Sequence, residues 1–123
     1  MGLVLVVGLG GALGAISRFG INIFFDHISA PGYWGTLLVN LVGSFLIGLI
    51  FVLFENRLPI PEMFRVGIVV GLLGGFTTYS AFSLEIVNML MSGLYARAGM
   101  YMITTVLACL SATLIGVIVA RTL

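Results

Sequence analysis

The chain of 123 residues is 61% hydrophobic and only 7% charged, with a formal net charge of +1. A soluble domain carries about 25% charged residues, so this composition excludes one and indicates an integral membrane protein. The small net charge argues against nucleic acid as a partner. The single cysteine, Cys109, excludes a disulfide framework and offers no zinc-binding pattern.

Four apolar stretches fill most of the chain. A helix needs about 20 residues to cross a bilayer, and each stretch is long enough. They run roughly from Leu3 to Phe25, from Tyr33 to Phe54, from Pro61 to Ser92 and from Gly99 to Ala120. Short connections place consecutive helices side by side and antiparallel. We therefore expect an all-α integral membrane protein of the cell (inner or plasma) membrane, with residues 1–123 forming one four-span domain.

The third stretch is interrupted near Gly74 to Thr78, inside the segment GGFTTYS that begins at Gly74. In hydrocarbon an unsatisfied backbone polar group costs several kcal/mol, so non-helical backbone is tolerated only where protein or a water-filled cavity covers it. This stretch is also longer than a straight span requires, which favours a tilt or a break. The interruption therefore predicts an ion or substrate site.

Small residues recur at every fourth position in all four stretches. The rows are Gly10 and Gly14; Asn40, Ser44 and Gly48; Gly67, Gly71 and Gly75; and Ala108, Ala112, Gly116 and Ala120. Such rows let helix backbones approach closely within a membrane. Because four helices enclose little interior, we expect the chain to form an oligomer.

The arginines give only a weak orientation signal. Arg57, Arg65 and Arg121 fall on the side of both termini, whereas Arg97 and Arg18 fall on or near the other side. So small a bias under the positive-inside rule is compatible with one fixed orientation or with insertion in both. In the second case, two opposite copies would pair about a two-fold axis in the membrane plane.

Two polar side chains inside the spans need partners. Arg18 is costly at membrane depth, so it reaches the interface, caps an aqueous vestibule or pairs with a carboxylate such as Glu85. Asn40 lies midway along the second stretch. Its amide either bonds a neighbouring helix or donates to an anion.

Aromatic and hydroxyl side chains follow the interruption and recur in the fourth stretch. Tyr79 and Phe82 are three residues apart and so share one helical face, and a ring edge carries the positive part of its quadrupole. The hydroxyl residues are Ser80, Ser83, Tyr101 and Thr105. Either these groups pack and bond to their own helices, or they line the path of a small anion.

Three segments carry a specific pattern: GGALGAISRF at residues 10–19, GTLLVNLVGSF at 35–45 and GGFTTYSAFSLE at 74–85. In this order and at these spacings, the chain resembles the small fluoride channels of the Fluc (CrcB) family along almost its whole length. The resemblance implies an antiparallel, dual-topology homodimer with two separate fluoride pores. It also implies a structural Na⁺ at the dimer centre, held by the backbone carbonyls of Gly74 and Thr77 of each copy.

The resemblance further implies roles for single residues. Tyr79 and Phe82 take the positions of the family's paired pore phenylalanines, and Asn40 takes that of its pore-side asparagine. Arg18 matches the first-span arginine, which we place at a vestibule. The fourth-span polar track falls on Tyr101 and Thr105. Apart from the resemblance, the serine hydroxyls near the break, those of Ser80 and Ser83, are expected to offer further partners to the ion.

The chain departs from the family pattern at three positions. Tyr79 stands where Phe is usual, and its phenol adds a donor and bulk. Ala81 stands where Thr or Ser is common. Cys109 falls where Ser is often found, and a thiol is a weaker donor than a hydroxyl.

The predicted function is passive, fluoride-selective export from the cytoplasm, without enzymatic activity. The alternative is a small proton-coupled multidrug transporter, which also has four spans but needs a carboxylate in the first. Here that stretch holds Arg18, and an acid, Asp26, occurs only at its end. A non-transporting packing subunit would have no need of a broken helix, and the only histidine, His27, lies in a loop and offers no catalytic cluster.

Overall fold

The computed structural model describes residues 1–56 and 58–123, and the side chain of residue 56 is also outside the description. Arg57, which entered the count of charges, therefore lies outside the described residues. All regular secondary structure in the described chain is helical. Its elements are α1 (Gly2–His27), α2 (Tyr33–Asn56), α3 (Glu62–Val66), the π-helix η1 (Gly67–Leu73), α4 (Gly74–Phe76), α5 (Tyr79–Met91) and α6 (Tyr95–Thr122).

Four helical segments are long and apolar enough to cross a membrane, which confirms the number of predicted spans. They are Gly2–His27, Tyr33–Glu55, Glu62–Met91 and Tyr95–Thr122. Two predicted boundaries are wrong: the last helix begins at Tyr95 rather than Gly99, and His27 is the last residue of α1 rather than part of a loop. Large apolar side chains such as Leu9, Leu13 and Ile16 are exposed along α1, as expected for a surface that faces lipid. The chain is a multi-pass membrane protein.

The helices end in defined caps on the side away from the termini. After α5, Gly93 takes a positive φ of 74°. The Leu94 N–H then bonds to the Met89 carbonyl at 2.9 Å, and the Gly93 N–H bonds to the Leu90 carbonyl at 3.0 Å. This pair of bonds is a Schellman motif, in which a left-handed residue satisfies the last carbonyls of a helix. Ser29, with φ 54°, ends α1 in the same way.

The third span is the irregular one. After α3 it winds as the π-helix η1 and returns to α-helical form only for the three residues of α4. Thr77 and Thr78 are then extended, with φ/ψ of −80°/157° and −150°/119°, before α5 begins. The break thus falls within the predicted segment but is narrower, because residues 74–76 remain helical. The π-helical segment was not predicted.

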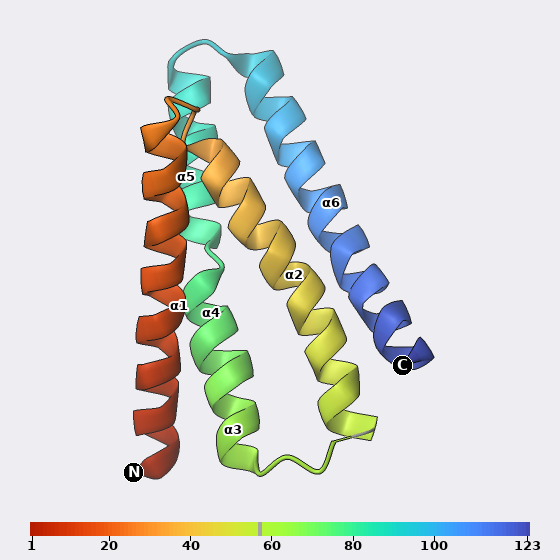
Figure 1. Cartoon of the computed structure of the whole chain (residues 1–123). Coiled ribbons are helices and arrows are strands. Elements are labelled where there is room, and N and C mark those ends of the chain that lie inside the picture. The colour runs from red at the N-terminus through yellow and green to blue at the C-terminus, as the bar shows by residue number, and fades with distance from the viewer. Residues whose placement is uncertain (57) are drawn as a thin grey trace.

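Two close helix contacts organise the bundle (Figure 1). In the first, α1 runs along η1 and α4; in the second, α2 runs along α6. The glycine rows explain the first contact: an added Cβ at Gly75 would lie 2.5 Å from the Gly11 carbonyl oxygen. In the second contact, an added Cβ at Gly116 would meet the backbone N of Leu49 at 2.8 Å. Small residues therefore set both interfaces, as predicted.

Replacing Gly71 by alanine tests the first contact. The new Cβ would lie 2.8 Å from the Val7 carbonyl oxygen and 3.1 Å from the Gly10 Cα, and backbone atoms cannot move aside as a flexible side chain can. Overpacking of this kind costs roughly 1–3 kcal/mol, so the midpoint of SDS-induced unfolding in mixed micelles should fall.

The matched control is Gly8→Ala, because an added Cβ at Gly8 meets nothing within 4 Å. Alanine favours a helix over glycine, so this variant should keep or raise the midpoint. A midpoint for Gly71→Ala that is no lower than that of Gly8→Ala would contradict the packing described here.

Candidate functional site

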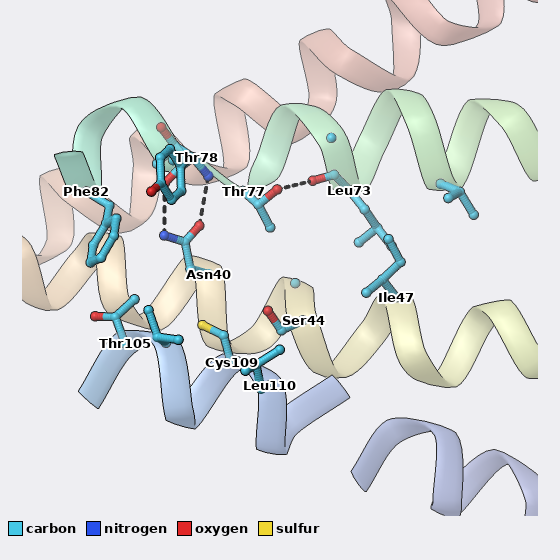
Figure 2. A pocket seen from close by; sticks show the side chains of 15 residues that line it. Asn40, Ser44, Ile47, Leu73, Thr77, Thr78, Phe82, Thr105, Cys109 and Leu110 are labelled. Atoms are coloured by element: carbon cyan, nitrogen blue, oxygen red, sulfur yellow. Dashed lines mark hydrogen bonds between the residues drawn. The ribbon is translucent and has the colours of Figure 1, made fainter. Parts of the chain in front are cut away.

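An open groove lies between α2, the broken third span and α6, with a cavity volume of about 470 Å³ (Figure 2). Apolar side chains such as Ile47, Leu73 and Leu110 form much of its wall. Its polar lining residues are Asn40, Ser44, Thr77, Thr78, Thr105 and Cys109. The groove therefore brings the break of the third span opposite polar groups from both neighbouring helices.

Asn40 joins α2 to the break through both atoms of its amide. Its Nδ2 donates to the Thr78 carbonyl oxygen at 2.9 Å, and its Oδ1 accepts from the Thr78 N–H at 2.8 Å (Figure 2). Thr78 has left the helix and is buried. Its backbone would otherwise lack partners at membrane depth, so one side chain satisfies both polar groups of the opened residue. The expected interhelical bond of Asn40 is present.

The two threonines of the break close the helix ends on either side. Thr77 follows α4, and its hydroxyl donates at 2.9 Å to the carbonyl of Leu73, the last residue of η1, which also accepts the Thr77 N–H at 3.0 Å. The Thr78 hydroxyl accepts from the Ala81 N–H at 3.2 Å and so caps the start of α5. The carbonyl end of one short helix and the amide end of another therefore meet here, with partial negative and positive charge respectively.

Glu85 forms a second polar cluster beside the groove, between α5, α2 and α6. Its Oε1 accepts from the Thr36 hydroxyl at 2.6 Å, and its Oε2 accepts from the Tyr101 hydroxyl at 2.7 Å. Arg18 makes no ion pair with this carboxylate, so that alternative for Arg18 is wrong. Arg18 is half-buried on α1.

A row of aromatic rings connects the groove with the ends of α2 and α6. Successive ring centroids are 5.5 Å apart for Tyr79 and Phe82, 5.4 Å for Phe82 and Tyr101, and 5.3 Å for Tyr101 and Tyr33. Phe82 is only 5% exposed, whereas Tyr79 is 79% exposed. The two rings of the predicted pair therefore differ: one is held by its own chain, and the other stands on the outer side of the groove.

The structure brings only some of the predicted site residues to the groove. Asn40, Gly74, Thr77, Tyr79, Phe82 and Thr105 line it. The Ser83 hydroxyl instead donates to the Tyr79 carbonyl at 2.9 Å, and Ser80 contacts the Thr78 hydroxyl at 3.2 Å. Tyr101 lies outside the groove lining and turns its hydroxyl to Glu85.

Among the described residues, the Thr105 hydroxyl is buried without a hydrogen-bond partner. A buried polar group without a partner costs free energy unless water, an ion or another molecule completes it. Of the buried hydroxyls that line this groove, Thr105 is therefore the one without a hydrogen-bond partner among the described residues, so it is free to bind something else.

Comparison with known proteins decides the family. The model of the CrcB-like protein, Camphor Resistance (CrcB) family matches residues 5–117. The chain belongs to the CrcB-like family. A relative from Magnetococcus marinus, named a fluoride-specific ion channel FluC, is 45% identical over 116 residues, which cover 94% of this chain and 94% of that protein.

Other CrcB-like relatives bear the same name. One from Opitutus terrae is 42% identical and covers 98% of this chain and 93% of its own. One from Nitrobacter winogradskyi is 40% identical and covers 96% of this chain and 94% of its own. The likeness therefore extends over nearly the full length of both partners in each comparison.

Several residues at the site were not among the predicted site residues: Thr78 and Cys109 in the groove, Glu85 in the second cluster, and two residues of α2. Ser44 lines the groove one turn after Asn40, and it had been assigned only to a row of small residues. Thr36 binds Glu85 one turn before Asn40. The spacing of Thr36, Asn40 and Ser44, four residues apart on α2, was the available signal for both.

Exchanging Asn40 for aspartate tests the clamp on the break. The new carboxylate would still accept from the Thr78 N–H but would set a negative oxygen against the Thr78 carbonyl, where an amide donor stood. Leaving the carbonyl of the buried Thr78 without its donor costs about 1–3 kcal/mol, so the SDS unfolding midpoint should fall.

Asn88→Asp is the control, because this substitution makes the same chemical change away from the break. Asn88 is exposed near the end of α5. Its midpoint should stay near that of the unchanged protein. Equal midpoints for the two variants would show that the clamp contributes nothing to stability.

Proposed function

We propose that this chain is a fluoride-selective ion channel that lets F⁻ leave the cell passively through the plasma membrane. The near full-length likeness to CrcB-like relatives named fluoride-specific ion channels carries the proposal. The groove at the broken third span supports it, since broken spans in membrane proteins line ion and substrate sites. In acidic surroundings fluoride enters the cell as neutral HF, which dissociates inside, so an electrically driven leak of F⁻ lowers its cytoplasmic level.

A fluoride path needs donors that replace water around a small, strongly hydrated anion and still release it. Asn40 has two amide N–H groups, and the Thr78 carbonyl uses one donor bond, so a second remains for the ion. The buried Thr105 hydroxyl lies across the groove without a partner. The edges of Tyr79 and Phe82 add a weak positive field that attracts an anion without trapping it.

The other predicted residues act around this path in the proposal. Ser80 and Ser83 hold the first turn of α5 through the Thr78 hydroxyl and the Tyr79 carbonyl, and each hydroxyl oxygen adds polarity beside the rings. Tyr101 and Glu85 form the polar wall between the groove and the end of the bundle. Arg18, half-buried on α1, attracts anions to a vestibule.

The proposed assembly is an antiparallel homodimer with two pores and one central Na⁺. Gly74 is exposed, and a Cβ added there would meet nothing within 4 Å, so this face of the break is open to a second copy. The extended backbone at Thr77 ends the helical hydrogen bonding of α4, which frees carbonyls for a hard cation. Gly74 and Thr77 of both copies would together hold the ion, which is structural.

A proton-coupled multidrug transporter is not favoured. Such a transporter needs a titrating carboxylate in its first span, and in α1 the only acid is the exposed Asp26 of the last turn. The carboxylate that does lie within the membrane, Glu85, is occupied by two hydroxyl donors.

Efflux from liposomes that hold the purified protein tests the function. A K⁺ ionophore lets K⁺ leave with the anion, so that no opposing voltage builds up. Fluoride and chloride electrodes, read in parallel, should then show rapid fluoride release and no chloride release. Liposomes with Asn40→Asp should release no fluoride, because a carboxylate repels the anion at the break. A lack of fluoride release from well-folded, unchanged protein would refute the proposal, and near-normal release by Asn40→Asp would remove Asn40 from the path.

Replacing Na⁺ with N-methylglucamine should weaken the dimer. A ligand at 100 times its Kd stabilises a folded state by about 2.7 kcal/mol, so removing Na⁺ should lower the unfolding free energy by up to this amount. The measurement is the SDS unfolding midpoint with dimer content read by cross-linking, and re-addition of Na⁺ is the control. Unchanged values in the two buffers would exclude a structural Na⁺ without bearing on fluoride selectivity.

A further inference from the structure

A second pocket lies between the first turns of α2 and α6, at the end of the bundle away from the termini. Its volume is about 320 Å³. Tyr33, Leu37 and the buried Tyr101 form its inner wall, and Trp34, Arg97 and Met100 form its exposed rim. The proposed fluoride path does not use this pocket. Only one of the pocket's lining residues, Tyr101, takes part in that path, through the bond from its hydroxyl to Glu85.

Arg97 is the only charged residue of this pocket and has no partner in the described chain. It lies in the first turn of α6, and its side chain is exposed. The carboxylate nearest to the inner wall, that of Glu85, is taken by the hydroxyls of Thr36 and Tyr101 and does not line the pocket. The pocket therefore presents an uncompensated positive charge.

The aromatic residues place this pocket at the level of lipid headgroups. Tyr33 and Trp34 open α2, with ring centroids 5.4 Å apart, and Trp34 is 46% exposed. Trp and Tyr rings at span ends favour the boundary between hydrocarbon and headgroups. Met100, 70% exposed, continues the rim along α6 toward the hydrocarbon. A cation at the headgroup level above an apolar wall matches a phosphate joined to an acyl chain.

We propose that this pocket binds a phospholipid with an anionic headgroup, with the phosphate at Arg97 and an acyl chain against Leu37 and Met100. Basic pockets between spanning helices bind such headgroups, and a single basic residue at an anionic surface contributes about 1 kcal/mol, or roughly fivefold in affinity. This binding would be independent of fluoride transport, because no residue assigned to the ion lies on the rim.

The fluorescence of Trp34 reports on this pocket alone, since it is the only tryptophan of the chain. The purified protein is placed in phosphatidylcholine vesicles that contain increasing fractions of brominated phosphatidylglycerol, or of brominated phosphatidylcholine as reference. Bromine quenches only a nearby indole, so the two curves give the relative affinity. We expect a roughly fivefold preference for phosphatidylglycerol.

Matched arginine variants assign the preference to its residue. Arg97→Gln should bring the ratio to about one, Arg97→Lys should retain much of it, and Arg121→Gln, at the other end of α6, should leave it unchanged. If Arg97→Gln does not fold, a salt series on the unchanged protein replaces it, and the preference should fall as salt screens the exposed charge.

Four results would overturn the proposal. They are equal quenching by the two lipids, a preference that persists in Arg97→Gln or is insensitive to salt, loss of the preference when inorganic phosphate replaces chloride at constant ionic strength, and no quenching by either lipid. The third would mean that a small anion occupies the pocket, and the fourth that protein covers it.

Discussion

The whole arrangement depends on one constraint, which is that backbone opened inside a membrane must find its hydrogen bonds within the protein. Thr77 and Thr78 leave the helix in the middle of the third span. A single amide, that of Asn40, satisfies both polar groups of Thr78, and the two threonine hydroxyls bond the helix ends on either side. Without these partners the break would cost several kcal/mol for each group left bare in hydrocarbon.

The two helix contacts leave one side of the third span free, and on that side the Asn40 clamp holds α2 to the break. The glycines of α1, η1 and α4 use one side of the third span for tight backbone packing. Its other side, where the break faces α2 and α6, keeps side chains and an open groove. Packing and polarity are thus divided between two faces of one interrupted helix, and only the face that packs loosely has room for an ion.

The sequence predicted the features that depend on one helix at a time. The spans follow from runs of apolar residues, the close contacts from glycines at every fourth position, and the break from the segment around Thr77. What could not be predicted depends on how helices rotate against one another. Tyr101 and Thr105 lie on one face of α6, yet one hydroxyl is taken by Glu85 and the other is buried without a partner. The π-helix η1, which packs against α1, likewise had no signal in the local sequence.

Under the proposed function, this unequal use of hydroxyls has a consequence for selectivity. A hydroxyl whose hydrogen is already donated, as in Ser83 and Tyr101, offers an anion only its lone pairs and repels it. The groove donors that remain are the second N–H of Asn40 and the hydroxyls of Thr105 and Ser44, too few to replace a full hydration shell. Partial dehydration at scattered donors, aided by ring edges, would let fluoride bind and still leave, because conduction requires sites that are weak enough to empty. The same scarcity disfavours chloride, which is larger and must pass the buried ring of Phe82 at the groove wall.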